Sequence, residues 1–151
     1  MKNSDVIREV IDAFNGGDLE AVLSRLHAEI DWALAEGHPY SPEGTAWRGH
    51  QQLIENFFMR AAADWDGFTV ILQELYDAGD CVVVEVRYTG RFRATGATLA
   101  AQGCHVWGLR DGKVVRFQQY VDTAQLRDAM AGGPASASAS RRSNRQPSPR
   151  R

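Results

Sequence analysis

Residues 105–122 read HVWGLRDGKVVRFQQYVD, two apolar runs on either side of Asp111-Gly112. Asp-Gly between apolar runs is a strong signal for a β-hairpin, because both residues tolerate a positive φ at low cost. The first predicted strand contains His105 and Trp107, and the second ends at Asp122. Side chains on a strand repeat every two residues, so His105 and Trp107 share a face. We interpret this hairpin as the wall of a pocket.

The register of the hairpin decides which residues of its second strand face His105. A two-residue turn puts Tyr120 and Asp122 on the His105 face. A bulged three-residue turn instead puts Phe117 and Gln119 there, because a slip of one residue exchanges the two faces of a strand. Both registers fit the sequence.

The rest of the chain places helices before strands. Apolar residues at helical spacing predict helices between residues 6 and 14, from Asp18 to Leu26, and between 53 and 65. A short strand is expected over 30–34 and a long loop over 36–49. The pattern then predicts strands over 68–77, 80–93, 97–110 and 113–121, followed by a short helix that begins at Asp122. Helices followed by a strand meander are typical of an α+β fold.

Residues 4–131 resemble the SnoaL-like branch of the nuclear transport factor 2 (NTF2-like) superfamily, which also holds the ketosteroid isomerases and limonene epoxide hydrolases. The resemblance rests on the order and spacing of short motifs. These are Phe14-Asn-Gly-Gly-Asp18, Ile30-Asp31-Trp32, Trp47-Arg-Gly49, Thr95-Gly96, Asp111-Gly-Lys-Val and Tyr120-Val-Asp122. The resemblance implies a cone-shaped α+β barrel, in which a curved antiparallel β-sheet is wrapped by three N-terminal helices around an internal cavity. The predicted order of elements fits the same shape.

Two residues are the candidate catalytic pair. By the resemblance, His105 falls where ketosteroid isomerases place the acid that hydrogen-bonds the developing oxyanion, and an imidazole can donate the same bond. Asp122 matches the aspartate that serves as general acid/base in the SnoaL polyketide cyclases. Each residue has a structural alternative: His105 bonded to a neighbour without catalytic duty, and Asp122 acting as the N-cap of the last helix.

The chain departs from two relatives at their catalytic positions. The ketosteroid isomerase tyrosine aligns with Val10 and its aspartate with the region of Leu34, so steroid isomerisation is not expected. The Arg-x-Asp pair of limonene epoxide hydrolases aligns with Arg87-Tyr88-Thr89, and Gln119 stands opposite in place of their second acid. Epoxide hydrolysis by that triad is therefore not expected either.

A rich set of aromatic residues predicts a cavity for a flat apolar ligand. The substrate-binding residues that we predict are Trp32, Tyr40, Phe57, Arg87, Trp107 and Tyr120. The preferred function is a cofactor-free isomerase or cyclase that transfers a proton next to a carbonyl of a ring-containing or polyketide-like substrate. The alternative is a non-catalytic ligand-binding or dimerisation module, because one fold hosts many functions.

The charge distribution along the chain limits the kinds of binding partner that we expect. Residues 132–151 contain five arginines and no acids, which leaves 12 basic and 19 acidic residues, a net charge of −7, in residues 1–131. An acidic domain does not favour a phosphate backbone, so no nucleic-acid binding is expected of it. The basic tail over 132–151 lacks large apolar residues and is predicted to be disordered.

The remaining expectations concern metals and cofactors, the cysteines, the location of the protein and its oligomeric state. The four histidines show no metal-binding spacing, and the chain contains no cofactor-binding motif, so neither a metal nor a cofactor is expected. Cys81 and Cys104 are expected to be free thiols. Without a signal or a membrane-spanning segment, the protein is predicted to be cytoplasmic. The strand over 80–90 is apolar on both faces, at Val82, Val83, Val84 and Val86, which predicts a homodimer through the outer face of the sheet.

Overall fold

The structure, a computed structural model, describes residues 1–132. It begins with α1 (Asn3–Asn15), α2 (Leu19–Ser24), β1 (Leu26–Ala33) and β2 (Trp47–Arg48). A third helix follows in three parts, α3 (Gly49–Leu53), the π-helical η1 (Ile54–Phe58) and α4 (Met59–Asp64). The chain then forms β3 (Trp65–Asp77), β4 (Cys81–Phe92), β5 (Thr98–Arg110), β6 (Lys113–Val121) and α5 (Thr123–Ala131). The α+β prediction is confirmed, and the predicted tail lies outside the described residues from residue 133 onward.

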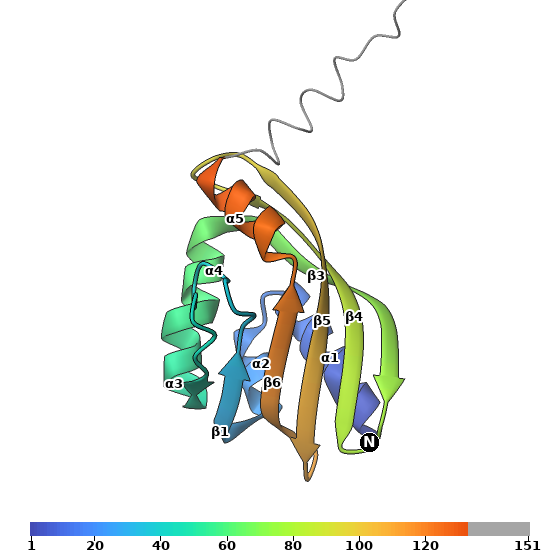
Figure 1. Ribbon diagram of the computed structural model, residues 1–151. Coiled ribbons are helices and arrows are strands. Elements are labelled where there is room, and N and C mark those ends of the chain that lie inside the picture. The colour runs from blue at the N-terminus through green and yellow to red at the C-terminus, as the bar shows by residue number, and fades with distance from the viewer. Residues whose placement is uncertain (133–151) are drawn as a thin grey trace, which may run out of the picture.

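The strands form one curved sheet in the order β2-β1-β6-β5-β4-β3, with the three N-terminal helices against it (Figure 1). Neighbours from β3 to β6 are antiparallel, but β1 runs parallel to β6, with Trp32 opposite Phe117. The sheet is therefore mixed. The predicted curved sheet with its antiparallel strand meander is confirmed, and the parallel pairing of β1 with β6 adds to it. The sequence did not indicate this pairing, because the two strands lie about 85 residues apart and no hairpin turn sets their relative direction.

Local sequence explains how α1 and α2 form and meet the sheet. Val6, Ile7 and Val10 share the buried face of α1, as their spacing predicts. The Asp18 carboxylate accepts a hydrogen bond from the backbone N–H of residue 21 at 3.0 Å, so Asp18 is the N-cap of α2. At the end of α1, the Asn15 side chain donates to the backbone carbonyl of residue 70 and accepts from the N–H of the same residue, which ties the helix to β3.

The β5–β6 hairpin combines features of both predicted registers. Asp111 and Gly112 have φ of 51° and 73°, and they form the two-residue turn. A β-bulge next to Gly108 then shifts the pairing by one residue, so His105 lies opposite Gln119. A bulge adds one residue to a single strand, so it reverses the faces beyond it without changing the turn.

Other boundaries differ by a few residues. The third helix ends at Asp64, and Trp65 begins β3 instead of closing the helix. Leu26 begins β1, which is longer than the strand predicted over 30–34. Trp65 and Leu26 are both buried. Their burial does not distinguish a helix from a strand, because an apolar side chain can be buried on the inner face of either element.

The core lies between the concave face of the sheet and the helices. Along β4, Val82, Val84, Val86 and Tyr88 are buried on that face. Their neighbours point to the outer face, where Val83 is half-buried. No helix in residues 1–132 is long and apolar enough to cross a membrane.

Candidate functional site

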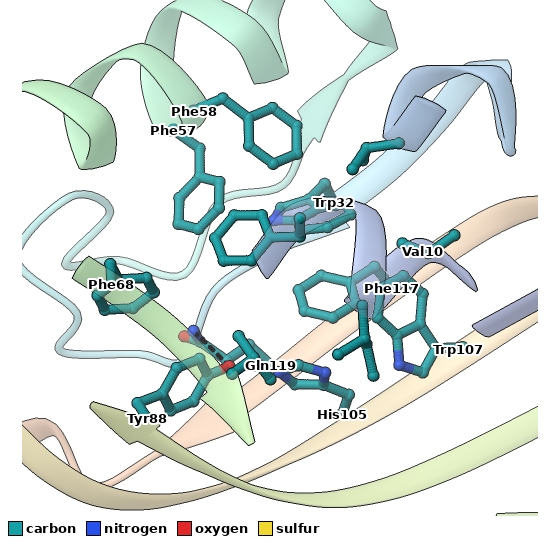
Figure 2. Close-up of a pocket in the computed structure, with 14 residues that line it drawn as sticks. Val10, Trp32, Phe57, Phe58, Phe68, Tyr88, His105, Trp107, Phe117 and Gln119 are labelled. Atoms are coloured by element: carbon teal, nitrogen blue, oxygen red, sulfur yellow. Dashed lines mark hydrogen bonds between the residues drawn. The ribbon is translucent and has the colours of Figure 1, made fainter. Parts of the chain in front are cut away.

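A largely aromatic cavity lies inside the cone, between α1, η1 and the concave face of the sheet (Figure 2). Its free space is about 30 Å³, and none of the residues that line it is an acid, a lysine or an arginine. The lining residues are Val10, Ile11, Phe14, Val22, Trp32, Phe57, Phe58, Phe68, Val70, Tyr88, His105, Trp107, Phe117 and Gln119. The side chains themselves fill most of the volume, so a ligand must displace some of them.

Phe117 is the centre of the aromatic group (Figure 2). Its ring stacks on Trp32 with centroids 3.8 Å apart, and it lies 4.5 Å from the centroid of Trp107 and 4.9 Å from that of His105. The parallel pairing of β1 and β6 puts Trp32 opposite Phe117, and the hairpin puts Trp107 opposite it on the other side. Three neighbouring strands therefore build one wall of the cavity.

A chain of hydrogen bonds crosses the sheet beside this wall. The backbone N–H of Ala35 donates to Gln119 Oε1 at 3.4 Å, and Gln119 Nε2 donates to the Tyr88 hydroxyl at 3.1 Å. The Tyr88 hydroxyl in turn forms a hydrogen bond with Nε2 of His105. All three side chains are buried.

The direction of this chain follows from its first donor. A backbone N–H can only donate, so the Gln119 amide must present its oxygen to Ala35 and its nitrogen to Tyr88. Tyr88 then has one proton to give, and it donates that proton to His105 Nε2. In a neutral imidazole the other nitrogen carries the proton, so Nδ1 of His105 is a donor.

Burial keeps His105 neutral. It lowers the pKa of His105 from 6.5 to about 3, because the charged form loses its hydration. Burial likewise raises the pKa of Tyr88, and the hydrogen bond from Gln119 acts in the opposite direction with a smaller effect. Near neutral pH, both groups therefore stay uncharged and the direction of the hydrogen-bond chain is kept.

Three buried donors near the cavity wall have no partner. Among the described residues, the buried side-chain nitrogen and oxygen atoms without a hydrogen bond are Trp32 Nε1, His105 Nδ1 and Trp107 Nε1. All three residues line this cavity, and they are 5%, 3% and 2% exposed. Leaving a buried donor unsatisfied costs about 1–3 kcal/mol, so these atoms mark a place where an acceptor would stabilise the protein.

Gly103 leaves room for the tyrosine of this chain. A Cβ atom on Gly103 would lie 2.6 Å from Cε2 of Tyr88 and 3.0 Å from the backbone oxygen of Tyr120. Its φ is not positive, so close packing alone selects glycine here. Sequence reasoning missed this residue, and an isolated glycine inside a predicted strand was the signal that could have found it.

The loop between β1 and β2 is fastened to α4 through Tyr40. The Tyr40 hydroxyl donates to Asp64 Oδ2 at 2.6 Å, and the Arg60 guanidinium lies 4.1 Å above the Tyr40 ring. His38 Nδ1 accepts from the N–H of Tyr40, and burial, with a smaller effect of Arg60, lowers the pKa of His38 to about 4. Tyr40 therefore closes a small space beside Gln119 and does not line the aromatic cavity itself.

Of the predicted catalytic pair, the structure puts only His105 in the cavity. Asp122 caps α5: its carboxylate accepts from the N–H of Gln125 at 3.2 Å and from Gln125 Nε2 at 2.9 Å. It is not among the residues that line the cavity. This geometry supports the capping alternative for Asp122.

The predicted binding residues divide between the two faces of the sheet. Trp32, Phe57 and Trp107 line the cavity. Tyr120 is 55% exposed on the outer face, where Arg87 Nη1 also donates to the backbone carbonyl of Ala100. The bulge in the hairpin accounts for Tyr120, because it turns Gln119 inward in its place.

A second, wider hollow adjoins the cavity. Its volume is about 450 Å³, and it lies between the end of α1, α2, α4 and the start of β3. Phe14, Val22, Phe58 and Phe68 line both spaces, so they form the partition between them. Phe57 and Phe58 are consecutive residues of the π-helical turn η1, and both are buried. The described residues contain no group of three or more His, Cys, Asp or Glu that could hold a metal ion.

Comparison with known proteins gives relatives of the same fold. A family model for the SnoaL-like domain matches residues 7–117. An NTF2-like protein from Burkholderia thailandensis is 31% identical, with a TM-score of 0.80 over 86% of this chain and 98% of its own. No match was found among the curated proteins.

Two further solved structures resemble this chain. TerC, co-crystallised with polyporic acid, is 27% identical, with a TM-score of 0.75 over 85% of this chain and 98% of its own. IdmH, a candidate polyketide cyclase from Streptomyces antibioticus, is 22% identical, with a TM-score of 0.72 over 87% of this chain and 99% of its own. The second likeness concerns the fold alone.

Proposed function

The chain belongs to the SnoaL-like domain family of NTF2-like fold, and from that premise we propose that it binds a ring-containing small molecule whose carbonyl oxygen accepts a hydrogen bond from His105. The observation that carries this proposal is the directed chain Ala35–Gln119–Tyr88–His105, which ends in a neutral N–H donor inside an aromatic cavity. Polyporic acid bound to TerC is consistent with a small-molecule site in this fold.

The chain of hydrogen bonds improves His105 as a donor. A hydrogen bond accepted at Nε2 withdraws electron density from the ring and makes the Nδ1 proton a stronger donor. The nonpolar surroundings strengthen the bond to a carbonyl oxygen further. The planar aromatic walls bury a flat ligand and orient its oxygen toward His105.

Binding of matched bicyclic probes tests this proposal. We expect 1-indanone, which has one carbonyl, to bind about fivefold tighter than indane, which has none, because one net hydrogen bond is worth about 1 kcal/mol. In His105→Phe the two probes should bind equally, whereas His105→Gln, which keeps a donor, should retain part of the difference. Calorimetry or tryptophan fluorescence measures all six affinities. Failure of every probe to bind would refute the proposal.

A second candidate function is proton transfer next to that carbonyl, as in an isomerase or a cyclase. The donor position favours it, because the hydrogen bond from His105 strengthens as charge builds on an enolate oxygen. We assign Asp122 as the proton carrier, which requires its carboxylate to leave Gln125 and turn toward the adjoining space that Val121 lines. The lining of the described cavity contains no carboxylate, so binding without catalysis is the function that the geometry supports best.

We also propose that the protein forms a homodimer through the outer face of the sheet. Ile71, Tyr76 and Tyr120 are 46%, 53% and 55% exposed on that face, and they are among the largest exposed apolar residues described. Covering them would remove a substantial apolar surface from water.

A further inference from the structure

We propose that the cavity selects ligands with two hydrogen-bond acceptors on one ring system, the first held by His105 and the second by the indole N–H groups of Trp32 and Trp107. The ligand class is a planar dicarbonyl compound or its enolate, in place of a phenol, an amine or a cation. This inference rests on the proposed function for the first acceptor and adds the second.

The buried side-chain atoms that lack a hydrogen-bond partner are all donors, and this determines the chemical class of the ligand. The unsatisfied side-chain atoms in the described interior are three N–H groups, and no buried side-chain acceptor among the described residues lacks a partner. A hydroxyl or amino proton on a ligand would find no free acceptor among them, whereas carbonyl oxygens would satisfy the donors. The free space of about 30 Å³ holds about one water molecule, whose two lone pairs cannot accept from three donors.

The rings that carry these donors lie close together. The Trp107 centroid is 5.8 Å from that of Trp32 and 5.5 Å from that of His105. All three rings lie around Phe117, as Figure 2 shows. The face of an aromatic ring is a weaker hydrogen-bond acceptor than a carbonyl oxygen. An indole N–H therefore forms a stronger hydrogen bond with the carbonyl oxygen of a dicarbonyl ligand than with a neighbouring ring.

Electrostatics favours the same class. The cavity lining has no acid to balance a cation, and the N–H hydrogens present positive ends to the ligand. An enolate, which carries negative charge on its oxygens, suits this environment better than an ammonium ion. The faces of aromatic rings attract cations, so a cation is the alternative ligand that the aromatic cavity could favour. The test therefore includes a cation beside the carbonyl compounds.

The experiment compares N-methylphthalimide, which has two carbonyls and no donor, with 1-indanone, indane and tetramethylammonium. In the wild-type protein we expect N-methylphthalimide to bind about fivefold tighter than 1-indanone. Trp107→Phe and Trp32→Phe should each reduce the preference for N-methylphthalimide over 1-indanone more than they reduce the preference for 1-indanone over indane. Trp65→Phe, which alters a buried tryptophan outside the cavity lining, is the matched control and should keep both preferences.

A measurement on the wild-type protein keeps the test independent of the variants' folding. In ¹H–¹⁵N spectra, N-methylphthalimide should move the indole N–H resonance of Trp32 or Trp107 downfield, and it should leave that of Trp65 in place. Equal affinity of N-methylphthalimide and 1-indanone, with unmoved indole signals, would overturn the inference while the proposed carbonyl site stands. Tighter binding of tetramethylammonium than of any carbonyl probe would overturn the inference as well. No binding of any bicyclic probe would instead refute the proposed function.

Discussion

His105 acquires its character from residues on three other segments of the chain. The backbone of Ala35 orients Gln119, Gln119 orients Tyr88, and Tyr88 determines which nitrogen of His105 carries the proton. A histidine with the same strand position but without this chain could take either tautomer. The donor in the cavity is therefore a property of the network and not of the histidine alone.

Gly103 is the residue on which this network depends sterically. We expect Gly103→Ala to displace the Tyr88 ring, break its hydrogen bond to His105 and lower the free energy of unfolding by about 1–3 kcal/mol. Urea unfolding measures the stability, and ¹⁵N chemical shifts of His105 should show a mixture of tautomers. Gly108→Ala, on the same strand as Gly103, is the control, because its Cβ would lie 3.3 Å from Cβ of Arg116 on β6 and would not meet Tyr88. Equal effects of the two substitutions would contradict this role for Gly103.

The low pKa of His105 predicts how stability depends on pH. The folded pKa of about 3 lies below the ordinary value of 6.5, so the unfolded chain binds this proton first as the pH falls. The contribution of neutral His105 is complete above about pH 6.5 and is lost as the pH falls toward 3. We expect His105→Gln to unfold with a weaker pH dependence than the wild type between pH 7 and pH 4, measured by urea unfolding. Parallel curves would show that His105 has the same pKa in the folded and unfolded states, which would contradict this prediction.

At the scale of elements, the bulge in the β5–β6 hairpin decides which side chains reach the site. The two-residue turn alone would bring Tyr120 and Asp122 to the His105 face, and the bulge brings Phe117 and Gln119 there instead. One inserted residue thus replaces a phenol and a carboxylate with a phenyl ring and an amide. The cavity consequently contains donors and apolar surface but no acid.

The same shift leaves Asp122 at the start of α5. We expect Asp122→Ala to lower the free energy of unfolding by about 1 kcal/mol and Asp122→Asn to lower it less, because asparagine is also a good N-cap. Thermal or urea unfolding of the two variants measures this difference. Under the proton-transfer proposal, Asp122→Asn must also lower turnover at least about a hundredfold once a substrate is found. Unchanged turnover in Asp122→Asn would leave Asp122 with the capping role alone.

At the scale of the whole molecule, the sheet separates two surfaces with different tasks. The concave face and the helices enclose the aromatic cavity, and the outer face presents Ile71, Tyr76 and Tyr120. A cone whose wall is one sheet can bind a ligand on one side and a second subunit on the other. Changes at the outer face should therefore leave the cavity intact.

A homodimer through this outer face is the prediction at this scale. We expect a dimer in sedimentation velocity at micromolar concentration and dissociation of the dimer in the double variant Ile71→Glu and Tyr120→Glu, because two new charges per subunit would face each other across the interface. Ala124→Glu, an exposed position on α5, is the control and should remain dimeric. A monomeric wild-type protein would contradict the prediction.

The sequence by itself determined the order of the elements, because each element depends on neighbours in the chain. Helical spacing of Val6, Ile7 and Val10 predicted α1, Asp18 predicted the start of α2, and Asp111-Gly112 predicted the hairpin turn. It also predicted that His105 and Trp107 share a face, because strand side chains alternate. These are local rules that no distant contact needs to complete.

Only the tertiary structure decided what surrounds His105. The parallel pairing of β1 with β6 joins distant segments of the chain, and the approach of Tyr88 to Gly103 joins two neighbouring strands. The bulge near Gly108 lies within a local hairpin, but the sequence fits both registers of that hairpin. Their outcome is set by how side chains pack against one another and not by any local preference. For this reason the sequence predicted a cavity wall that contains His105 and left two roles open for Asp122. The tertiary structure shows the hydrogen-bond chain, the three unpartnered N–H groups and the capping hydrogen bonds of Asp122.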